Sequence, residues 1–312
     1  MPRLDEMSEF IIGVDIGGTT IKLGAVSEGK VYFKKVIKTP SLSDAEKNID
    51  AIAYEIEQIV KETKADTVGI GVPGIIDSEK GKIIYSNNIA VSNVSFVDLL
   101  SKKINLKCKI INDANAAVLA EWKYGAGKGF QNVAMFTLGT GVGCGMVING
   151  NPLLSGNGYL AAGGHMIIKS NGRKCNCGSF GCLEQYASAT ALIRDTKKLL
   201  KKRKSILDED NLTAKSIFDA ERLNDVVAVE VVEKYISYLS DGVASVYNLF
   251  FPEVFILGGG VSNAGESFIK QVAEKVGRKI YCKEFADKII IKAAQMGNDA
   301  GIIGAALFSE LK

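Results

Sequence analysis

Short apolar runs recur along the chain and predict buried strands. They lie at residues 10–14, 67–72, 109–111, 133–138 and 254–257, and each is followed by glycine, proline or a polar residue. Stretches with helical spacing separate most of these runs. Strands that alternate with helices are typical of an α/β protein, which is the fold class we expect.

Helical spacing is clearest in residues 44–63. Two further long amphipathic stretches lie at residues 187–202 and 225–249, and shorter helical patterns cover residues 114–123 and 301–311. In the first of these helices the apolar side chains recur every three or four residues and share one face, which predicts that this face is buried. They are Ala45, Ile49, Ile52, Ile56, Ile59 and Val60.

The first strand opens an antiparallel meander whose pattern recurs later in the chain. Strands at residues 22–26 and 31–37 follow it, and Glu28-Gly29 marks the turn between them. A shift of 121 residues, from 18 to 139, superimposes Gly18-Thr19 on Gly139-Thr140.

The same shift also pairs the glycines of the second strand and of the hairpin turn, Gly24 with Gly145 and Gly29 with Gly150. One explanation is chance, because hairpins share turn chemistry. The other is an internal repeat, in which two similar α/β domains each offer a glycine turn to one ligand.

Charge and composition exclude several classes of protein. Lys and Arg number 38 and Asp and Glu 35, so the net charge of +3 is too small for a strongly basic nucleic-acid binder. No apolar run reaches the ~18 residues of a membrane span, and Met1–Glu9 lacks the apolar core of a signal peptide. We therefore expect a cytoplasmic protein with neither nucleic-acid nor membrane partners.

Three glycine-rich turns each follow an apolar run, at residues 15–20, 139–143 and 258–260. Successive backbone N–H groups in such turns form concavities that bind anions, and glycine lets the backbone approach a ligand closely. The turns therefore predict a polyphosphate ligand. None is a P-loop, because no Gly-Lys pair in the chain is followed by Ser or Thr.

The single histidine, His165, precedes a cluster of three cysteines, Cys175, Cys177 and Cys182. In a cytosolic chain such clustering favours metal over disulfides. One His and three Cys form the ligand set of a closed structural zinc site, which organises a loop rather than activating water. The alternative is three reduced cysteines beside a surface histidine.

Asp113 lies between a predicted strand and a predicted helix. One interpretation is a helix N-cap, a common role for Asp or Asn that would also suit Asn112. The other is a functional carboxylate, because α/β proteins bind ligands at the carboxyl ends of their strands. The sequence leaves both open.

Taken together, these features resemble the ROK family of sugar kinases, whose fold is similar to that of actin and hexokinase. The resemblance runs from Gly13 to Ala306. Its motifs are Val14-Asp-Ile-Gly-Gly-Thr-Thr-Ile-Lys22, Gly71-Val-Pro-Gly74, Asn112-Asp-Ala-Asn-Ala-Ala117, Leu138-Gly-Thr-Gly-Val-Gly143, Cys175-x-Cys-Gly-x-x-Gly-Cys-x-Glu184 and Gly297-Asn-Asp-Ala-Gly301.

The resemblance implies an α/β fold of two actin-like (ribonuclease H-like) domains with an interdomain cleft. We expect residues 1–112 plus 300–312 to form the smaller domain. Residues 113–299 would form the larger domain, which carries the zinc-binding loop. The family also implies a homodimer.

The resemblance further implies roles for individual residues. Asp113 would be the general base that accepts a proton from a sugar hydroxyl, and Mg²⁺ would lie near Asp15. The expected sugar contacts are Gly74, Asn88, Asn112, Asp113, His165 and Glu184. The expected ATP contacts are Asp15, Gly17, Gly18, Thr19, Thr20, Lys22, Gly139, Thr140, Gly141, Gly258, Gly259, Gly260 and Val261.

The activity that the resemblance implies is ATP-dependent phosphorylation of a hexose at its 6-hydroxyl, with glucose favoured. The small-molecule partners would be a sugar and ATP, and the cofactors Mg²⁺ and a structural Zn²⁺. Two alternatives stay open. The chain is then either a sugar-binding regulator with weak or no turnover, or a kinase for fructose, mannose or an N-acetylhexosamine.

One departure from the family pattern concerns residue 162. The family usually has Glu-x-Gly-His at the zinc histidine, and that Glu hydrogen-bonds the sugar, whereas this chain has Ala162-Gly-Gly-His165. Alanine offers no acceptor. A hydrogen bond to a charged group contributes about 1.5–3 kcal/mol, which corresponds to about one to two powers of ten in affinity.

We therefore predict that Ala162→Glu raises kcat/KM for glucose by about one to two powers of ten, because it restores a charged acceptor. Coupled ADP release over a range of glucose concentrations measures this effect. Unchanged glucose kinetics in the variant would show that residue 162 does not limit the use of glucose.

Overall fold

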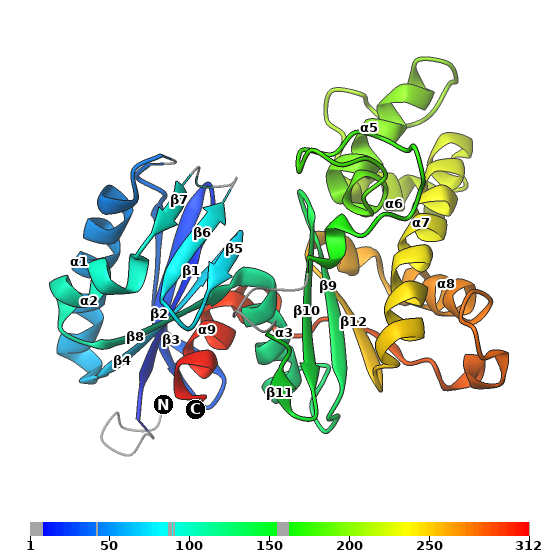
Figure 1. The fold of residues 1–312 in the computed structure, drawn as a ribbon. Coiled ribbons are helices and arrows are strands. Elements are labelled where there is room, and N and C mark those ends of the chain that lie inside the picture. The colour runs from blue at the N-terminus through cyan, green and yellow to red at the C-terminus, as the bar shows by residue number, and fades with distance from the viewer. Residues whose placement is uncertain (1–8, 42, 87–88, 90, 155–161, 312) are drawn as a thin grey trace. The chain divides into compact units, whose positions relative to one another are not determined.

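The computed structural model describes residues 9–311 except residues 42, 87, 88, 90 and 155–161. Packing divides the chain into two compact units (Figure 1). The first unit contains residues 1–129, 145–161 and 296–312, and the second contains residues 130–144 and 162–295. The domain ranges expected from the sequence, with boundaries at residues 112 and 300, stay a prediction.

The first unit is built on a five-stranded sheet with the order β3-β2-β1-β4-β8. β1 pairs antiparallel with β2 and β2 with β3, so the predicted meander is confirmed. β4 pairs in parallel with β1, and β8 pairs in parallel with β4. The carboxyl ends of β1, β4 and β8 therefore lie at one edge of the sheet. The strands are β1 (Ile11–Ile16), β2 (Thr20–Ser27), β3 (Lys30–Lys38), β4 (Thr67–Val72) and β8 (Lys107–Asn112).

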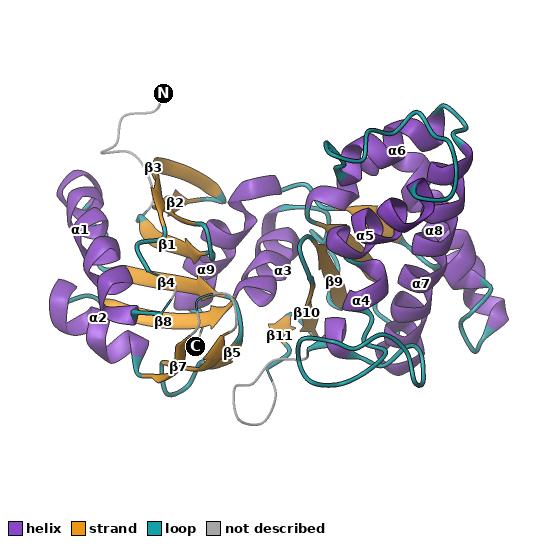
Figure 2. Cartoon of the chain, turned by 90° about the horizontal axis from the view of Figure 1, so that it is seen from above, coloured by secondary structure: helices purple, strands orange, loops and turns teal. Residues whose placement is uncertain are grey.

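Helices cover both faces of this sheet (Figure 2). On one face lie α1 (Ala45–Thr63) and α2 (Phe96–Ile104), and on the other lies α9 (Ala300–Glu310), which packs against α3 (Asp113–Tyr124). Asp44 caps α1 by accepting hydrogen bonds from two backbone N–H groups of its first turn. The predicted apolar face of α1 is buried against the sheet.

The second sheet has the order β11-β10-β9-β12-β13, which repeats the arrangement of the first. In each sheet a hairpin is followed by two parallel strands. Both hairpin turns have positive φ at two successive residues, 49° and 75° at Glu28-Gly29 and 50° and 73° at Asn149-Gly150, as in type I′ turns. The shared strand order favours an internal repeat over chance likeness of two hairpins. The strands are β9 (Val133–Leu138), β10 (Val142–Ile148), β11 (Asn151–Pro152), β12 (Val254–Gly258) and β13 (Ile291–Ala293).

The helices of the second unit pack around α7, which contacts α4, α5, α6 and α8. The helix predicted over residues 187–202 is confirmed as α5, but it begins two residues later, because Ser188 has extended backbone and caps α5 by accepting from the Ala191 N–H. The helices are α4 (Glu184–Ala187), α5 (Ala189–Leu200), α6 (Ala214–Arg222), α7 (Val226–Phe250) and α8 (Glu266–Gly277).

The first unit also contains a small antiparallel sheet that the sequence pattern did not predict. It consists of β5 (Ile75–Asp77), β6 (Lys82–Ser86) and β7 (Val91–Val94), in that order. The Cα of Gly74, at the start of this sheet, lies so close to the Tyr85 carbonyl that a Cβ would stand 2.3 Å from that oxygen. The β5–β7 sheet therefore fixes the backbone around Gly74.

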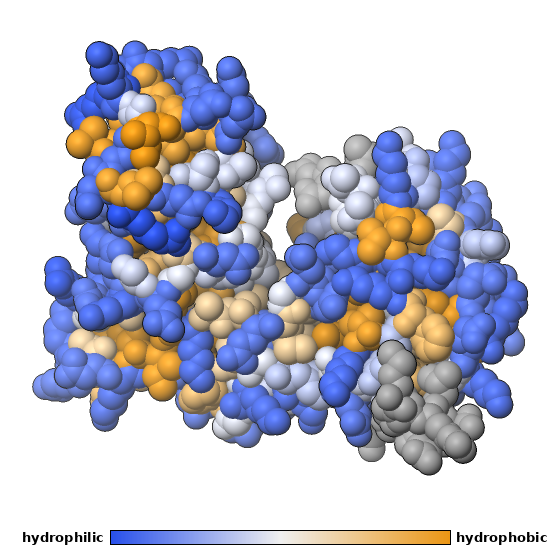
Figure 3. Space-filling model, turned by 180° about the vertical axis from the view of Figure 1, so that it is seen from behind, coloured by the Kyte–Doolittle hydropathy of each residue, from blue (hydrophilic) through white to orange (hydrophobic). Residues whose placement is uncertain are grey.

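Surface composition agrees with a globular protein. Hydrophilic residues cover most of the face in Figure 3, and hydrophobic residues form separate patches on it. Among the residues that the structure describes, no helix has both the length and the apolar character that a membrane crossing needs.

The α9 helix lies directly against the backbone of the first sheet. A Cβ on Gly13 in β1 would stand 2.0 Å from the Ile302 carbonyl oxygen, and one on Gly69 in β4 would stand 1.8 Å from that of Ala305. Only glycine therefore allows this approach.

The same close packing joins α9 to α3. A Cβ on Gly304 would stand 1.6 Å from the Ala116 carbonyl oxygen, so the two helices meet backbone to backbone. Glycines on β1, β4 and α9 thus allow four elements, β1, β4, α9 and α3, to pack backbone to backbone.

We predict that Gly69→Ala destabilises the protein by at least the about 1–3 kcal/mol typical of overpacking, because its Cβ would clash with backbone that cannot move aside. Gly71→Ala on the same strand is the matched control, because the nearest atom to its Cβ would be 3.5 Å away, an ordinary contact. Thermal unfolding measures both variants. Equal melting temperatures would contradict the role given to Gly69.

Candidate active site

Asn112 ends β8 and is the N-cap of α3. Its Oδ1 accepts hydrogen bonds from the N–H groups of Ala114 at 2.8 Å and Asn115 at 3.3 Å. Its Nδ2 donates to the Gly74 carbonyl at 2.9 Å, so two of the expected sugar contacts lie together. Because Asn112 takes the capping role, the alternative that Asp113 is the cap is excluded.

Asp113 is the first residue of α3 and is half-buried. Its Oδ1 accepts a hydrogen bond from the Ala114 N–H at 2.9 Å. Burial, followed by the negative charge of Asp15, raises the pKa of Asp113 to about 6. A carboxylate with this pKa is ionised at neutral pH yet basic enough to accept a proton, which suits a general base.

Asp15 lies at the carboxyl end of β1, where Lys22 Nζ is 3.3 Å from its Oδ2. Burial raises the pKa of Asp15, and the charge of Lys22 opposes that shift. A Cβ on Gly301, in the first turn of α9, would stand 2.6–2.9 Å from the atoms of this carboxylate. Glycine at 301 therefore lets the amino end of α9 approach Asp15, and a helix amino end favours negative charge.

The first glycine turn follows Asp15. The Gly17 N–H donates to the Thr20 carbonyl at 2.9 Å, and Thr39 Oγ1 donates to the Gly17 carbonyl at 2.6 Å. The Thr39 N–H also donates to the Thr19 carbonyl at 3.0 Å. These bonds hold the turn through Thr20 and Thr39, and they leave the side chain of Thr19 exposed.

The second glycine turn, at residues 139–143, is fixed by α4 and α5. Glu184 Oε2 accepts a hydrogen bond from the Val142 N–H at 3.1 Å, and a Cβ on Gly141 would stand 2.2 Å from the same oxygen. Thr190 Oγ1 donates to the Thr140 carbonyl at 2.8 Å. An expected sugar contact, Glu184, thus lies against an expected phosphate turn.

The third glycine turn, at residues 258–260, lies beside the second. Gly259 has a φ of 79°, and a Cβ there would stand 2.4 Å from the Leu138 carbonyl oxygen, directly before Gly139. Ser262 Oγ donates to the Gly259 carbonyl at 2.7 Å, and Val261 is buried. The second and third turns therefore form one glycine-rich surface of the second unit.

The two glycines before His165 let this segment approach the second glycine turn closely. A Cβ on Gly164 would stand 1.9 Å from the Val142 carbonyl oxygen, and one on Gly163 would stand 2.7 Å from Cys144 Sγ. Val142 thus contacts Gly164 through its carbonyl and Glu184 through its N–H. This one residue of β10 positions two of the expected sugar contacts.

The four expected zinc ligands come together in the second unit. The ligand atoms of His165, Cys175, Cys177 and Cys182 all lie within 4.8 Å of one another. The Sγ atoms of Cys177 and Cys182 are 3.7 Å apart, and His165 Nδ1 is 3.6 Å from Cys175 Sγ.

This geometry fits zinc. Bonds of about 2.3 Å to sulfur and about 2.0–2.1 Å to nitrogen in a tetrahedron place two sulfurs about 3.8 Å apart, and nitrogen and sulfur about 3.6 Å apart. A zinc ion held here would take Nδ1 of His165 and leave Nε2 of the ring available. Gln185 Nε2 also donates to Cys175 Sγ, at 3.8 Å.

The chain matches known proteins along nearly its whole length. The sequence profile of the ROK family matches residues 11–311. The chain belongs to the ROK family. It is 39% identical to the glucokinase of Thermotoga maritima over 98% of this chain and 97% of that protein. It is 30% identical to a xylose repressor of Caldicellulosiruptor bescii, over 94% of this chain and 76% of the repressor.

Solved structures of ROK proteins have the same fold. A ROK family glucokinase from Streptomyces griseus, in complex with glucose and AMPPNP, is 34% identical, with a TM-score of 0.84 over 96% of this chain and 99% of that one. A ROK hexokinase from Thermus thermophilus is 30% identical, with a TM-score of 0.83 over 96% and 97%. The expected α/β fold of two actin-like domains is confirmed.

The expected site residues of this ROK protein form two groups, one in each unit. In the first unit Asp15 and Lys22 are paired, Asp15 acts on the pKa of Asp113, and Gly74 contacts Asn112. In the second unit the two glycine turns, Glu184, His165 and the zinc ligands share the contacts given above. Asn88 lies outside the described residues. The role of each residue stays a prediction.

Glu121 is a fully buried carboxylate on α3 that was not among the residues predicted from the sequence to have a role. Its Oε2 accepts a hydrogen bond from the Ala126 N–H at 2.8 Å, and its Oε1 accepts one from the Met296 N–H at 2.7 Å. Glu121 therefore joins the end of α3 to the segment that leads into α9. An acidic residue in an otherwise apolar helical stretch is the feature that could have revealed it.

We predict that the purified protein contains about one zinc per chain by metal analysis, because the four ligand atoms match a tetrahedral site. Cys182→Ser should lose the metal and lower the melting temperature, since a structural zinc contributes to folding. Cys282→Ser is the control, because Cys282 lies outside the cluster. A zinc-free protein with full activity and unchanged stability would contradict the zinc site.

Proposed function

We propose that this chain transfers the γ-phosphoryl group of ATP to the 6-hydroxyl of a hexose, with glucose favoured and Asp113 as the general base. The observation that carries the proposal is the position of Asp113. It follows the carboxyl end of β8, one of the three parallel strands of the first sheet. Asn112 takes the capping role in its place, and the pKa of Asp113 is raised toward neutrality. The similarity to glucokinases along nearly the whole chain supports it.

Asp113 accepts the proton of the 6-hydroxyl as that oxygen attacks the γ-phosphorus, and the bond from the phosphorus to the bridging oxygen of ADP breaks. Such transfer depends mostly on position and on stabilisation of charge. The backbone N–H groups of the glycine turns supply part of that stabilisation. Asp15 is the residue that would hold Mg²⁺, which neutralises phosphate charge when bound.

Glu184 and His165 bind hydroxyl groups of the sugar, and Val142 fixes both. Zinc, held by His165 and the three cysteines, would fix the ring through Nδ1 and leave Nε2 for the sugar. Four protein ligands close the metal site, so its role is to order the loop. The domain ranges expected from the sequence and a homodimer in solution belong to the same proposal.

The second candidate function is a sugar-binding regulator with weak turnover. Two observations favour it: Ala162 lacks the acceptor usual in the family, and xylose repressors are among the relatives. The retained Asn112-Asp113 pair and the glycine turns favour the kinase.

The deciding experiment is ADP release with Mg-ATP and a panel of hexoses. We expect sugar-dependent turnover at about 1–100 s⁻¹, and Asp113→Asn should abolish it while glucose binding persists in a calorimetric titration. The amide has nearly the same shape but cannot accept the proton. No turnover with any hexose from folded, zinc-loaded protein would favour the regulator instead.

The pH dependence follows from the raised pKa of Asp113. The base must be ionised, so kcat/KM should fall as the pH falls through about 6 and should level off above it. An unchanged kcat/KM down to pH 5, with the protein still folded, would exclude Asp113 as the base.

A further inference from the structure

A cavity of about 260 Å³ lies in the second unit, away from the glycine turns. Arg173 of the loop between His165 and Cys182, Asp195 and Lys198 of α5, and Lys234 of α7 contribute charged groups to its wall. None of the roles given above uses this cavity.

Aromatic side chains line part of the cavity. The rings of Tyr186 and Tyr238 pack with centroids 4.7 Å apart, and both line the cavity. The Arg173 guanidinium lies over the Tyr186 ring, 4.6 Å from its centroid. Such rings offer flat, partly apolar surface to a ligand, while the hydroxyl ends stay polar.

The wall carries a surplus of positive charge, because three cations face one carboxylate. Asp195 is already engaged, since its Oδ2 is 2.8 Å from Arg173 Nη1. The remaining guanidinium nitrogens of Arg173 have no hydrogen-bond partner among the described residues, and Lys198 has no ion pair there. Within the described part of the chain Lys234 forms an ion pair with Glu230 alone, an exposed contact at 2.6 Å.

We propose that this cavity binds a phosphorylated sugar the size of a hexose monophosphate. The phosphate would lie between Arg173, Lys198 and Lys234, and the sugar ring against Tyr238, because Arg173 already covers the Tyr186 ring. Guanidinium and ammonium groups are the usual partners of phosphate. At about 260 Å³ the cavity is small for a ligand site, which favours a monosaccharide over a nucleotide.

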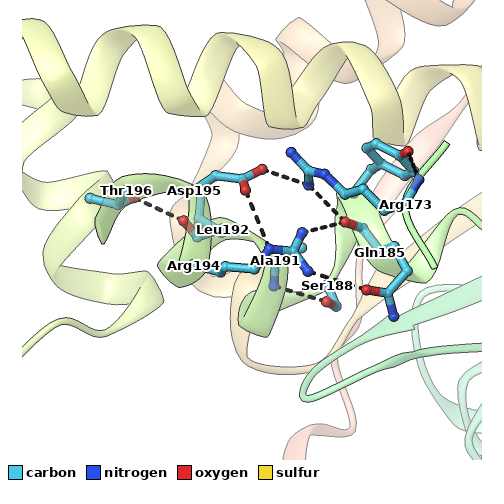
Figure 4. A network of polar contacts seen from close by, with 9 residues as sticks. Arg173, Gln185, Ser188, Ala191, Leu192, Arg194, Asp195 and Thr196 are labelled. Carbon is cyan, nitrogen blue, oxygen red and sulfur yellow. Dashed lines mark hydrogen bonds and ion pairs between the residues drawn. The ribbon is translucent and has the colours of Figure 1, made fainter. Parts of the chain in front are cut away.

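Arg173 of the cavity wall is hydrogen-bonded to Gln185, the residue that follows Glu184 (Figure 4). Arg173 Nη1 donates to the Gln185 carbonyl at 2.9 Å, and Arg194 also donates to it. Gln185 follows Glu184 directly and donates through Nε2 to Cys175 Sγ. A phosphate that draws Arg173 away from Gln185 therefore acts on the segment that holds Glu184, and this coupling rests on the proposed function.

The test is a calorimetric titration of glucose 6-phosphate into zinc-loaded protein saturated with glucose. We expect one bound ligand per chain, with affinity at least tenfold weaker in the double variant Lys198→Ala, Lys234→Ala. The control is Lys201→Ala, Lys202→Ala, which removes two exposed lysines outside the cavity and should bind like the wild type. Because binding is measured, the result does not depend on whether the chain is a kinase.

No binding to the wild type, or an equal loss in both double variants, would overturn the site. Equal affinity for inorganic phosphate would overturn the role of the sugar ring. In steady-state kinetics, glucose 6-phosphate should raise the KM for glucose more in the wild type than in the Lys198, Lys234 variant. An equal effect in both would overturn the coupling to Glu184.

Discussion

Backbone-to-backbone packing of α9 against β1, β4 and α3 is the constraint on which the candidate site of the first unit depends. Glycines at 13, 69 and 304 let backbone approach backbone at these contacts, so the backbones themselves limit the distances between the elements. Gly301 extends the same constraint to the site, because it allows the amino end of α9 to face the carboxylate of Asp15. Glu121 adds a buried polar link between α3 and the segment before α9. Asp113 starts the helix that these contacts hold, so its position relative to Asp15 follows from packing remote from any ligand.

In the second unit different contacts position the site residues, although the second sheet has the same strand order as the first. Here the glycine turn after the first strand is held by α4 and α5 through Glu184, and β10 positions His165 through Gly164. The proposed sugar contacts of this unit share one anchor, Val142, whereas those of the first unit share the Asn112 side chain and its bond to Gly74. An internal repeat thus gives two sheets with the same strand order. The segments inserted between their strands differ, and these segments carry the residues that distinguish the two halves of the site.

The features that the sequence predicted are those set by local pattern. The hairpin turns at Glu28-Gly29 and Asn149-Gly150 require positive φ, which these residues accept, and the cysteine cluster brings its own ligands together within a short loop. The sequence left Asn112 and Asp113 undecided as caps because both side chains can cap a helix, and they are distinguished by the two first-turn N–H groups that donate to Asn112 Oδ1. The β5–β7 sheet was not foreseen, because its strands are short and their pattern is mixed. Nor could Gly304 be assigned a contact, since its partner, Ala116, is far away in the sequence.

The electrostatics of the two carboxylates explain how one site can bind phosphates and still keep a competent base. Burial is the larger cause of the raised pKa of Asp113, and the charge of Asp15 adds to it. A cation that settles at Asp15 would cancel the smaller part of the shift and leave the larger part in place. A cation at Asp15 would lower the pKa of Asp113 from about 6 toward the ordinary value of a carboxyl group, so the carboxylate would stay ionised at neutral pH. Lys22 already offsets part of the charge of Asp15, which limits how far the two carboxylates repel each other. Among the groups of the protein itself, the packing that buries Asp113 is thus the main cause of its raised pKa, and the charge of Asp15 is the second.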